Sequence, residues 1–154
     1  MSLVLRKAHG KDVVPMHSLI VAGAEKGLLL PRSRGQIFTA LRDFFVLADE
    51  ETGGVAGCCA LAIIWENLAE VRSLYVADTH RRQGLGQKLV NACLEDAASF
   101  GITQVFTLTY QTAFFKGLGF AEVPKETLPQ KIWTDCIHCP KFPNCDEIAL
   151  IRSV

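Results

Sequence analysis

Apolar residues recur along the chain in two spacings, and together these predict a protein that mixes strands and helices. Short runs of branched and aromatic residues, bounded by glycine, proline or charged turns, are typical of strands. Apolar residues three or four positions apart are typical of one helix face. We expect strands at residues 3–8, 45–49, 55–65, 68–76, 102–109, 120–123 and 147–152, and helices at residues 13–27, 34–44, 85–100 and 112–118.

Turn residues and element order predict how the strands pair. The turn at Gly53-Gly54 joins the second and third strands as an antiparallel hairpin, and the fourth strand is expected to pair beside it. The strand at residues 102–109 follows a helix, an order that favours parallel pairing. Asp12 and Ser33 stand just before the first two helices, and we expect their side chains to cap them.

Length and composition favour one ordered domain. The chain has 154 residues, of which 49% are apolar and 21% charged, and its 16 basic and 16 acidic residues leave no net charge. A protein without net charge has no general attraction for nucleic acid, so any anion site is local. The apolar runs are too short to cross a membrane, and no signal segment is seen. We expect a single domain over residues 1–154, cytoplasmic, without nucleic acid or membrane as partner.

The cysteines fall into two groups. One lies in predicted core elements and the other near the C-terminus: Cys58, Cys59 and Cys93, then Cys136, Cys139 and Cys145. In a cytoplasmic chain this pattern suggests core thiols and a metal site more than a disulfide framework. The second group lies in a loop at residues 124–146 and, with His138 nearby, offers the ligands of a structural zinc. The alternative is a thiol cluster, reduced or partly oxidised, that folds this loop over the mouth of the site.

A glycine-rich turn between the fourth strand and the third helix is the first candidate for ligand binding. Its sequence is Arg81-Arg82-Gln83-Gly84-Leu85-Gly86. The free N–H groups at a helix start carry about half a positive charge and suit a phosphate, and glycine lets the backbone approach it closely. The two arginines add positive charge. The alternative is a strand-to-helix connection that needs glycine only for its geometry.

Two motifs together resemble the GCN5-related N-acetyltransferase (GNAT) family. The spacing Arg81-x-x-Gly84-x-Gly86 is similar to its motif for the coenzyme A pyrophosphate, and the aromatic residues 113–120 are similar to its second motif. The resemblance implies an α+β fold in which a mixed, mostly antiparallel sheet, flanked by helices, opens into a V-shaped acetyl-CoA cleft. The coenzyme contacts that it implies are Leu74, Tyr75, Val76, Arg81, Arg82, Gln83, Gly84, Leu85, Gly86, Phe114 and Phe115.

The resemblance also implies a direct reaction, in which a deprotonated amine attacks the thioester of acetyl-CoA without a metal. The physical contributions of such a site are orientation and stabilisation of the developing oxyanion. Many relatives carry a tyrosine on the short helix as general acid for the thiolate, where this chain has Phe114 and Phe115. Tyr110 is the candidate replacement. The alternative is that Tyr110 packs at a strand end and that the thiolate leaves without an acid.

Within the family the chain is most similar to the short bacterial N-acetylglutamate synthases, whose acetyltransferase domain stands alone. The similarity includes residues 28–33, 58–61, 68–74, 108–112 and 128–147. It implies that the acceptor is the α-amine of L-glutamate and that the product serves arginine biosynthesis. The alternative acceptors are another amino acid, a polyamine or a protein amine, and the alternative of a different class is a non-catalytic acetyl-CoA-binding or zinc-stapled module. Family members often form homodimers.

Glutamate has two carboxylates and a reacting amine, so its site requires cations or N–H donors at two places and a base at a third. Arg32 is the first choice for a carboxylate, because guanidinium binds carboxylate through two hydrogen bonds. Arg72 and Lys141 are second choices, and each of the three can instead be a solvated charge. The other expected contacts are Leu30, Thr109, Gln111 and one of Cys58 and Cys59, whose side chains point to opposite strand faces.

Glu70 is the expected general base, acting directly or through water, because it lies on the strand beside the thioester. Apolar surroundings raise the proton affinity of a carboxylate towards the range that a base needs. The alternative is a strand glutamate that faces solvent, and Glu66 is the next candidate for the base. His80 is expected to be an exposed turn residue.

Overall fold

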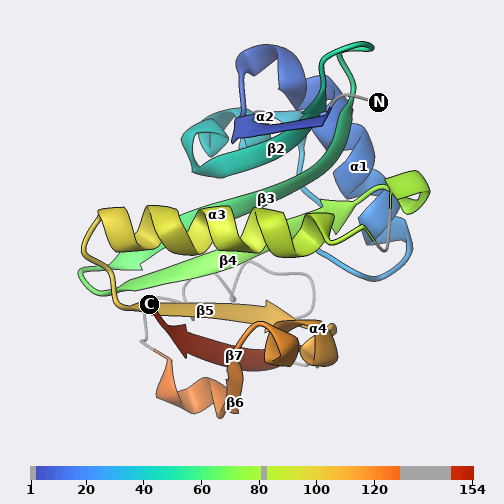
Figure 1. Cartoon of the computed structure of the whole chain (residues 1–154). Helices are drawn as coiled ribbons and strands as arrows, with labels where there is room; N and C mark the ends of the chain where they lie inside the picture. The colour runs from blue at the N-terminus through green and yellow to red at the C-terminus, as the bar shows by residue number, and fades with distance from the viewer. Residues whose placement is uncertain (1–2, 81–82, 129–146) are drawn as a thin grey trace.

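The computed structural model describes residues 3–80, 83–128 and 147–154, which form a seven-stranded sheet with helices on both faces (Figure 1). The strands are β1 (Leu3–Lys7), β2 (Phe44–Asp49), β3 (Val55–Trp65), β4 (Leu68–Val76), β5 (Gln104–Thr109), β6 (Ala121–Val123) and β7 (Ile148–Ser153). The α-helices are α1 (Val13–Glu25), α2 (Arg34–Thr39), α3 (Leu85–Ser99) and α4 (Thr112–Gly117). Short 3-10 helices occupy η1 (Gly10–Asp12), η2 (Leu41–Asp43), η3 (Asp78–His80) and η4 (Lys125–Thr127).

The strand order is β1-β2-β3-β4-β5-β7-β6, and it follows from the connections along the chain. β2, β3 and β4 are antiparallel neighbours joined by short turns, as the glycine turn predicts. α3 then crosses the sheet, and β5 runs parallel to β4. β7 lies between β5 and β6 and is antiparallel to both. The mixed, mostly antiparallel sheet expected from the sequence is confirmed.

Apolar clusters fill both sides of the sheet, because the side chains of a strand alternate between its two faces. α3 covers one face, where Leu89 and Cys93 pack against β3 and β4 (Figure 1). α1 and α2 cover the other face, where Met16 and Ile37 pack in a cluster with β2 and β3. The apolar face of α3 is the one that its sequence spacing predicts.

β4 and β5 pair over only three residues and then separate. The pairing ends at Glu70 and Phe106, although both strands continue beyond these residues. A hydrogen bond from the Thr107 hydroxyl to the Val71 carbonyl (2.9 Å) links the strands just after the last pair. Residues of both strands then line a common cavity. The two strands are therefore the walls of the expected V-shaped cleft.

β4 carries an extra residue on its wall of this cleft. The register against β3 shifts between Cys58–Tyr75 and Ala60–Arg72, so three steps along β4 match two along β3. Ser73 lies in this bulge with a φ of 57°, which residues other than glycine rarely adopt. A bulge interrupts the hydrogen-bond ladder, and here the Ser73 carbonyl accepts a hydrogen bond from the Cys58 thiol at 3.5 Å.

The two predicted helix caps have different outcomes. Ser33 caps α2, since its hydroxyl accepts from the Gln36 N–H (3.1 Å) while the Gln36 side chain accepts from the Ser33 N–H (2.8 Å). The prediction for Asp12 is wrong, because its buried carboxylate binds Arg6 at 2.7 and 3.1 Å and the His9 N–H at 2.7 Å instead of α1. Burial raises the pKa of Asp12, but these partners outweigh it, and the net pKa is lowered.

The expected boundaries differ from the observed ones mainly at α2. The helix expected up to residue 44 ends at Thr39, and η2 and β2 take up the rest. The 3-10 helices were not predicted, because three-residue turns have no periodic signal. Among the described residues, helices are too short or too polar to cross a membrane. Residues 129–146, most of the predicted cysteine-bearing loop, lie outside the described residues.

Candidate active site

Two cavities lie along the cleft and meet inside it. The larger one, here called the turn cavity, has a volume of about 460 Å³ and lies between the end of β4 and the start of α3. The smaller one, the inner cavity, has a volume of about 70 Å³ and lies between β4 and β5. Leu74 and Gln111 line both, so the two cavities join at these residues.

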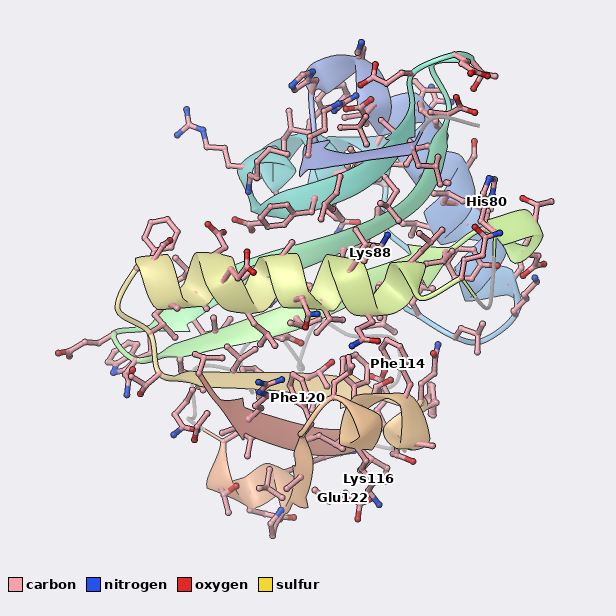
Figure 2. All side chains as sticks on the ribbon, in the orientation of Figure 1. His80, Lys88, Phe114, Lys116, Phe120 and Glu122 are labelled. Atoms are coloured by element: carbon pink, nitrogen blue, oxygen red, sulfur yellow. The ribbon has the colours of Figure 1, made fainter. Side chains whose placement is uncertain are left out.

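The turn cavity includes the glycine-containing start of α3. Gly84 takes the left-handed conformation (φ 71°) at the N-cap of α3, and a Cβ on Gly86 would lie 3.2 Å from Cζ of Phe114. The first N–H groups of a helix have no partner within it and present partial positive charge. The cavity can therefore hold a phosphate at the helix start, with Phe114 between α3 and α4 as an apolar wall (Figure 2).

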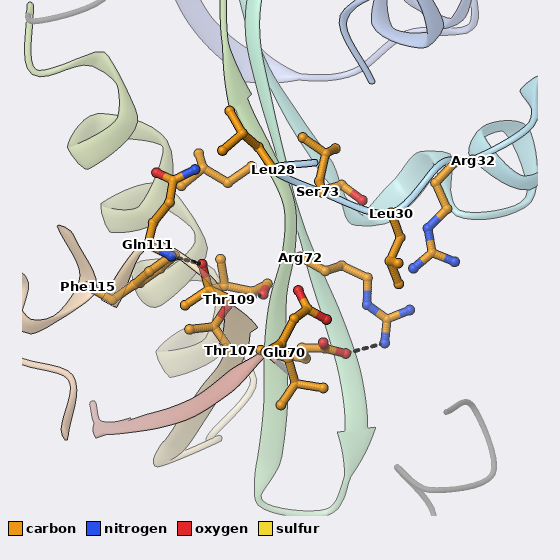
Figure 3. Close-up of a pocket in the computed structure, with 15 residues that line it drawn as sticks. Leu28, Leu30, Arg32, Glu70, Arg72, Ser73, Thr107, Thr109, Gln111 and Phe115 are labelled. Carbon is orange, nitrogen blue, oxygen red and sulfur yellow. Dashed lines mark hydrogen bonds and ion pairs between the residues drawn. The ribbon is translucent and has the colours of Figure 1, made fainter. Parts of the chain in front are cut away.

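Charged side chains of β4 dominate one wall of the inner cavity. Glu70 and Arg72 form an ion pair with 2.5 Å between Oε1 and Nη2, and both side chains are largely buried. Arg32, from the loop between α1 and α2, places its guanidinium on the same side of the cavity as that of Arg72 (Figure 3). Glu70 thus lies beside a guanidinium, which favours the ionised form of a carboxylate, and not between the apolar walls that were expected from the sequence.

A third cavity, of about 60 Å³, adjoins the inner cavity, and Arg32 and Arg72 line both. Asp43 lies in its wall. Burial raises the pKa of Asp43 above its ordinary value, although the positive charge of Arg72 opposes the shift. The guanidinium of Arg72 thus lies in the field of two carboxylates, Glu70 and Asp43, which favour its position at the cavity wall.

The opposite wall of the inner cavity carries neutral polar groups from the end of β5. The Thr109 hydroxyl oxygen accepts a hydrogen bond from the Gln111 N–H at 2.9 Å, so the hydroxyl can still donate its own proton to a ligand. Gln111 lines both cavities, and Figure 3 shows it beside Thr109 at the inner cavity. A ligand between the two strands would therefore meet the charges of β4 on one side and, on the other, the neutral donors of β5 and the carboxylate of Glu147.

The structure brings most of the predicted site residues to these cavities. The predicted base and acceptor contacts that line the inner cavity are Glu70, Leu30, Arg32, Arg72, Thr109 and Gln111. The predicted coenzyme contacts at the turn cavity are Leu74, Tyr75, Val76, Gly84, Leu85, Gly86 and Phe114. Phe115 is a core residue that lines the inner cavity instead. Gln83 is exposed and lines neither cavity. The predicted residues outside the described part are Arg81, Arg82, Lys141, Cys136, Cys139 and Cys145.

Cys58 and Cys59 point to opposite faces of β3, as expected, but both are fully buried in the core. Cys59 packs against Cys93, with 3.6 Å between the sulfur atoms. Neither cysteine of the pair lines the inner cavity, so the prediction that one of them contacts the acceptor is wrong. Burial raises the pKa of the Cys58 thiol to about 12, so it is not activated as a nucleophile.

Tyr110 and Glu66, the candidate acid and the alternative base, lie away from both cavities. Tyr110 is half-buried just after β5 and lines neither cavity, although its neighbour Gln111 lines both. Its role as an acid stays a prediction. Glu66 is exposed in the turn between β3 and β4, before the strand reaches the cleft. The position of Glu70 in the inner cavity favours it over Glu66 as the base.

Some cavity residues were missed from the sequence. Glu147, only 7% exposed, lines the inner cavity from just before β7. Thr109 of β5 pairs with Ile148 of β7, and this pairing brings the neighbouring Glu147 to the cavity. The two strands are far apart in the sequence, so no local sequence pattern indicates the contact. Thr107 also lines the inner cavity, and alternation along β5 could have indicated it. His80 is half-buried and lines the turn cavity, which corrects the expectation of an exposed turn residue.

The metal prediction falls mainly outside the described chain. In residues 3–80, 83–128 and 147–154, no group of three or more His, Cys, Asp or Glu side chains is arranged to hold a metal ion. Cys136, Cys139 and Cys145, the three candidate zinc ligands, lie outside the described residues. The structural zinc and the alternative without metal, a thiol cluster, therefore both stay untested.

Comparison with known proteins identifies the class to which this fold and cleft belong. The family model described as "Acetyltransferase (GNAT) family" matches residues 23–120, which include β4, the turn, α3 and α4. The chain belongs to this family. It is an acyltransferase, with acetyl-CoA as the donor of the acetyl group. The expected fold and donor are thereby confirmed, and the alternative of a non-catalytic module is set aside.

Individual relatives connect the chain to amino-acid acetyltransferases. An uncharacterized N-acetyltransferase of Chlorobaculum tepidum is 41% identical over 150 residues, which cover 97% of this chain and 96% of the relative. An amino-acid acetyltransferase of Mycobacterium tuberculosis is 32% identical over 121 residues, covering 78% of this chain and 69% of the relative. A crystal structure of N-acetylglutamate synthase from Neisseria gonorrhoeae, complexed with coenzyme A and N-acetyl-glutamate, matches with a TM-score of 0.84 and 25% identity, covering 99% of this chain and 35% of that chain.

Proposed function

We propose that this acyltransferase transfers the acetyl group of acetyl-CoA to the α-amine of L-glutamate and so serves arginine biosynthesis. The observation that carries the proposal is the inner cavity, where Arg32 and Arg72 lie on one side and Glu70 lies beside them. Two guanidiniums suit the two carboxylates of glutamate, and a carboxylate can accept the proton of its ammonium group. The similarity to an amino-acid acetyltransferase and to an N-acetylglutamate synthase supports the same acceptor.

In the proposed complex, acetyl-CoA places its pyrophosphate at the start of α3 and its thioester where the two cavities join, beside Leu74 and Gln111. Glutamate occupies the inner cavity, so that its amine faces this junction. The reacting groups are then held in one orientation, which is the main contribution of a site that needs no covalent intermediate.

The proposed reaction begins when the ammonium group of glutamate gives one proton to Glu70, directly or through water. The amine nitrogen attacks the thioester carbon, and a C–N bond forms. Backbone N–H groups of the β4 bulge are the proposed donors to the resulting oxyanion. The C–S bond then breaks, the nitrogen loses its second proton, and the departing thiolate of coenzyme A takes up a proton.

Arg72 is proposed to serve the base and the acceptor at the same time. Its guanidinium has five N–H donors in a plane, and one nitrogen, Nη2, binds Glu70. A guanidinium can bind two carboxylates through different nitrogen atoms, so the proposal places a carboxylate of the acceptor on Arg72 beside Glu70. Arg32 is the proposed partner of the other carboxylate, and Thr109 adds a neutral donor from β5.

A panel of acceptors tests this proposal most directly. Initial rates are measured with acetyl-CoA and, separately, glutamate, glutamine, ornithine, aspartate and spermidine. Glutamate is expected to have the highest kcat/KM, by about tenfold or more, because an acceptor that lacks a carboxylate leaves a buried guanidinium without its ligand. If glutamate is no better than the other amines, the assignment of the acceptor is wrong, and the best acceptor identifies the correct class.

A further inference from the structure

The end of α1 packs against the chain with no space for a side chain at Gly23. A Cβ built there would lie 2.2 Å from Cδ2 of Leu29 and 2.9 Å from Cδ1 of Tyr75, both closer than real Cβ contacts. Gly23 is itself a buried residue of α1. Glycine weakens a helix relative to alanine, so a glycine inside one commonly has a packing reason. Here the reason is that two side chains meet at the helix surface.

The two side chains that meet at Gly23 belong to different cavities. Leu29 lies in residues 28–32, here called the acceptor loop, and lines the inner cavity. Tyr75 lies at the end of β4, is 4% exposed and lines the turn cavity. The carbonyl of Gly23 also accepts a hydrogen bond from the Leu28 N–H at 3.0 Å. The helix end therefore contacts both the acceptor loop and the strand that carries the coenzyme contacts.

A second contact joins the same helix end to the segment before the glycine turn. Lys26, which follows α1, forms an ion pair with Asp78 in η3, and its ammonium lies 6.0 Å from the ring centroid of Tyr75. Both charged side chains are largely exposed, and exposed pairs are weak. The close packing at Gly23, rather than this ion pair, is therefore the main determinant of the arrangement.

We propose that Gly23 is a positioning residue for the acceptor. The absence of a side chain at Gly23 lets Leu29 pack beside Tyr75. This packing sets the distance between the acceptor loop, which carries Arg32, and the acetyl-CoA thioester that is proposed to lie beside β4. Gly23 acts through Leu29 and does not touch either substrate. The proposal rests on the proposed function only in naming glutamate as the acceptor.

The substitution Gly23→Ala tests the proposal through the difference between the two substrates. The added methyl displaces Leu29, whose side chain is the more flexible of the two neighbours, and the acceptor loop moves with it. We expect KM for glutamate to rise about tenfold, because small misplacements of a positioned group have large effects on reactivity. The dissociation constant of coenzyme A, measured by calorimetry, is expected to stay within about twofold of the wild-type value. An unchanged KM, or an equal loss of coenzyme affinity, contradicts the proposal.

A compensating variant separates positioning from general damage. In Gly23→Ala/Leu29→Ala, the Leu29 atoms that the new Cβ would meet are gone and only the contact with Cδ1 of Tyr75 (2.9 Å) remains, so KM for glutamate is expected to approach that of Leu29→Ala alone. Effects that simply multiply in the double variant contradict the proposed route through Leu29. Gly10→Ala is the control for the loss of a glycine, since a Cβ there has no neighbour within 4 Å. If Gly23→Ala does not fold, Leu29→Ala alone must raise this KM and spare coenzyme binding.

Hydrogen exchange of the acceptor loop gives a readout that does not depend on the acceptor. The Leu28 amide, bonded to the carbonyl of Gly23, is expected to exchange at least about tenfold faster in Gly23→Ala, whereas amides of α3 keep their wild-type rates. If the acceptor panel rejects glutamate but this amide is released, the proposed function fails and the positioning role stands. If the amide keeps its protection, the positioning role fails, whatever the acceptor is.

Discussion

The turn cavity and the inner cavity lie in one cleft but are built in different ways. The described residues of the turn cavity come mainly from one part of the chain, residues 74–76, 80 and 84–87, and this cavity offers the N–H groups at the start of α3. The inner cavity draws on separate segments, residues 28–30, 32, 70–74, 107–109, 111, 115 and 147, and several of these carry charged or polar side chains. A donor site of the first kind is sensitive to changes of backbone conformation. An acceptor site of the second kind can change its specificity through single side chains.

The substitution with the largest expected effect removes the proposed base from the inner cavity and leaves the turn cavity unchanged. Glu70→Gln abolishes the proposed proton acceptor, and general base catalysis typically contributes about 10²–10⁴-fold, so kcat is expected to fall by that order. Coenzyme affinity should not change. Rates over a range of pH and calorimetric titration with coenzyme A measure the two quantities.

The control for this variant is Glu66→Gln, in the exposed turn between β3 and β4, which is expected to behave as wild type. If Glu70→Gln keeps near-normal turnover across the pH range, another group accepts the proton of the acceptor amine. Glu147, the other buried carboxylate of the inner cavity, would then be the next residue to replace.

A smaller effect is expected for the carboxylate clamp. Arg32→Ala removes a guanidinium from the inner cavity, and KM for glutamate is expected to rise about 10–100-fold because a charge-assisted hydrogen bond is lost. The change in kcat should be smaller, since the binding contact exists before the transition state. Arg34→Ala, on the exposed surface of α2, is the matched control. Equal losses for glutamate and for uncharged acceptors would show that Arg32 does not bind the carboxylate.

The corresponding test of the turn cavity changes backbone conformation only. Gly84 has a φ of 71°, and a side chain disfavours this left-handed conformation by roughly 1–2 kcal/mol. Gly84→Ala is therefore expected to weaken coenzyme A binding about tenfold, with KM for glutamate little changed. Gly117→Ala, where a Cβ meets no atom within 4 Å, is the control. Loss of glutamate binding without loss of coenzyme affinity would contradict the division between the two cavities.

The substitution with the smallest expected effect on either cavity is at Asp12, which lies just before α1. The pKa of Asp12 is lowered in the folded protein, so its stabilisation is complete above the unfolded value of about 3.9 and is lost as the pH falls through the folded pKa. Urea unfolding from neutral pH to about pH 3 should show this loss. Asp12→Asn is expected to remove it while both substrate affinities stay normal. If the stability of Asp12→Asn falls with decreasing pH as steeply as that of the wild type, Asp12 is not the source of this loss.

Local sequence signals predicted the turn cavity well. The strand bounds 55–65 and 68–76 follow from apolar runs and turn residues, and the glycine motif marks the start of α3 directly. These features depend on neighbours in the sequence. The resemblance to the GNAT family added the expected roles, and the cavity contacts of Gly84, Gly86 and Phe114 agree with them.

The inner cavity was harder to predict, because its residues meet only through the tertiary fold. Alternation along β3 places Cys58 and Cys59 on opposite faces, but it does not tell that helices cover both faces at that point. The bulge at Ser73 appears only when β4 is aligned with β3. Glu147 reaches the cavity only through the register of β7 on β5. Register between distant strands is set by packing, which a single sequence does not display.

Because β4 and β5 pair only over a short stretch, bound substrates are expected to contribute to the stability of the sheet. In the described chain, the two strands share three residue pairs and the bond between Thr107 and Val71. A ligand in the cleft touches both strands and so bridges a gap in the sheet. Saturation at about a hundred times Kd adds about 2.7 kcal/mol to the stability of a protein. Bound substrates are therefore expected to stabilise the β4–β5 region of the sheet, and product release is expected to reverse this stabilisation.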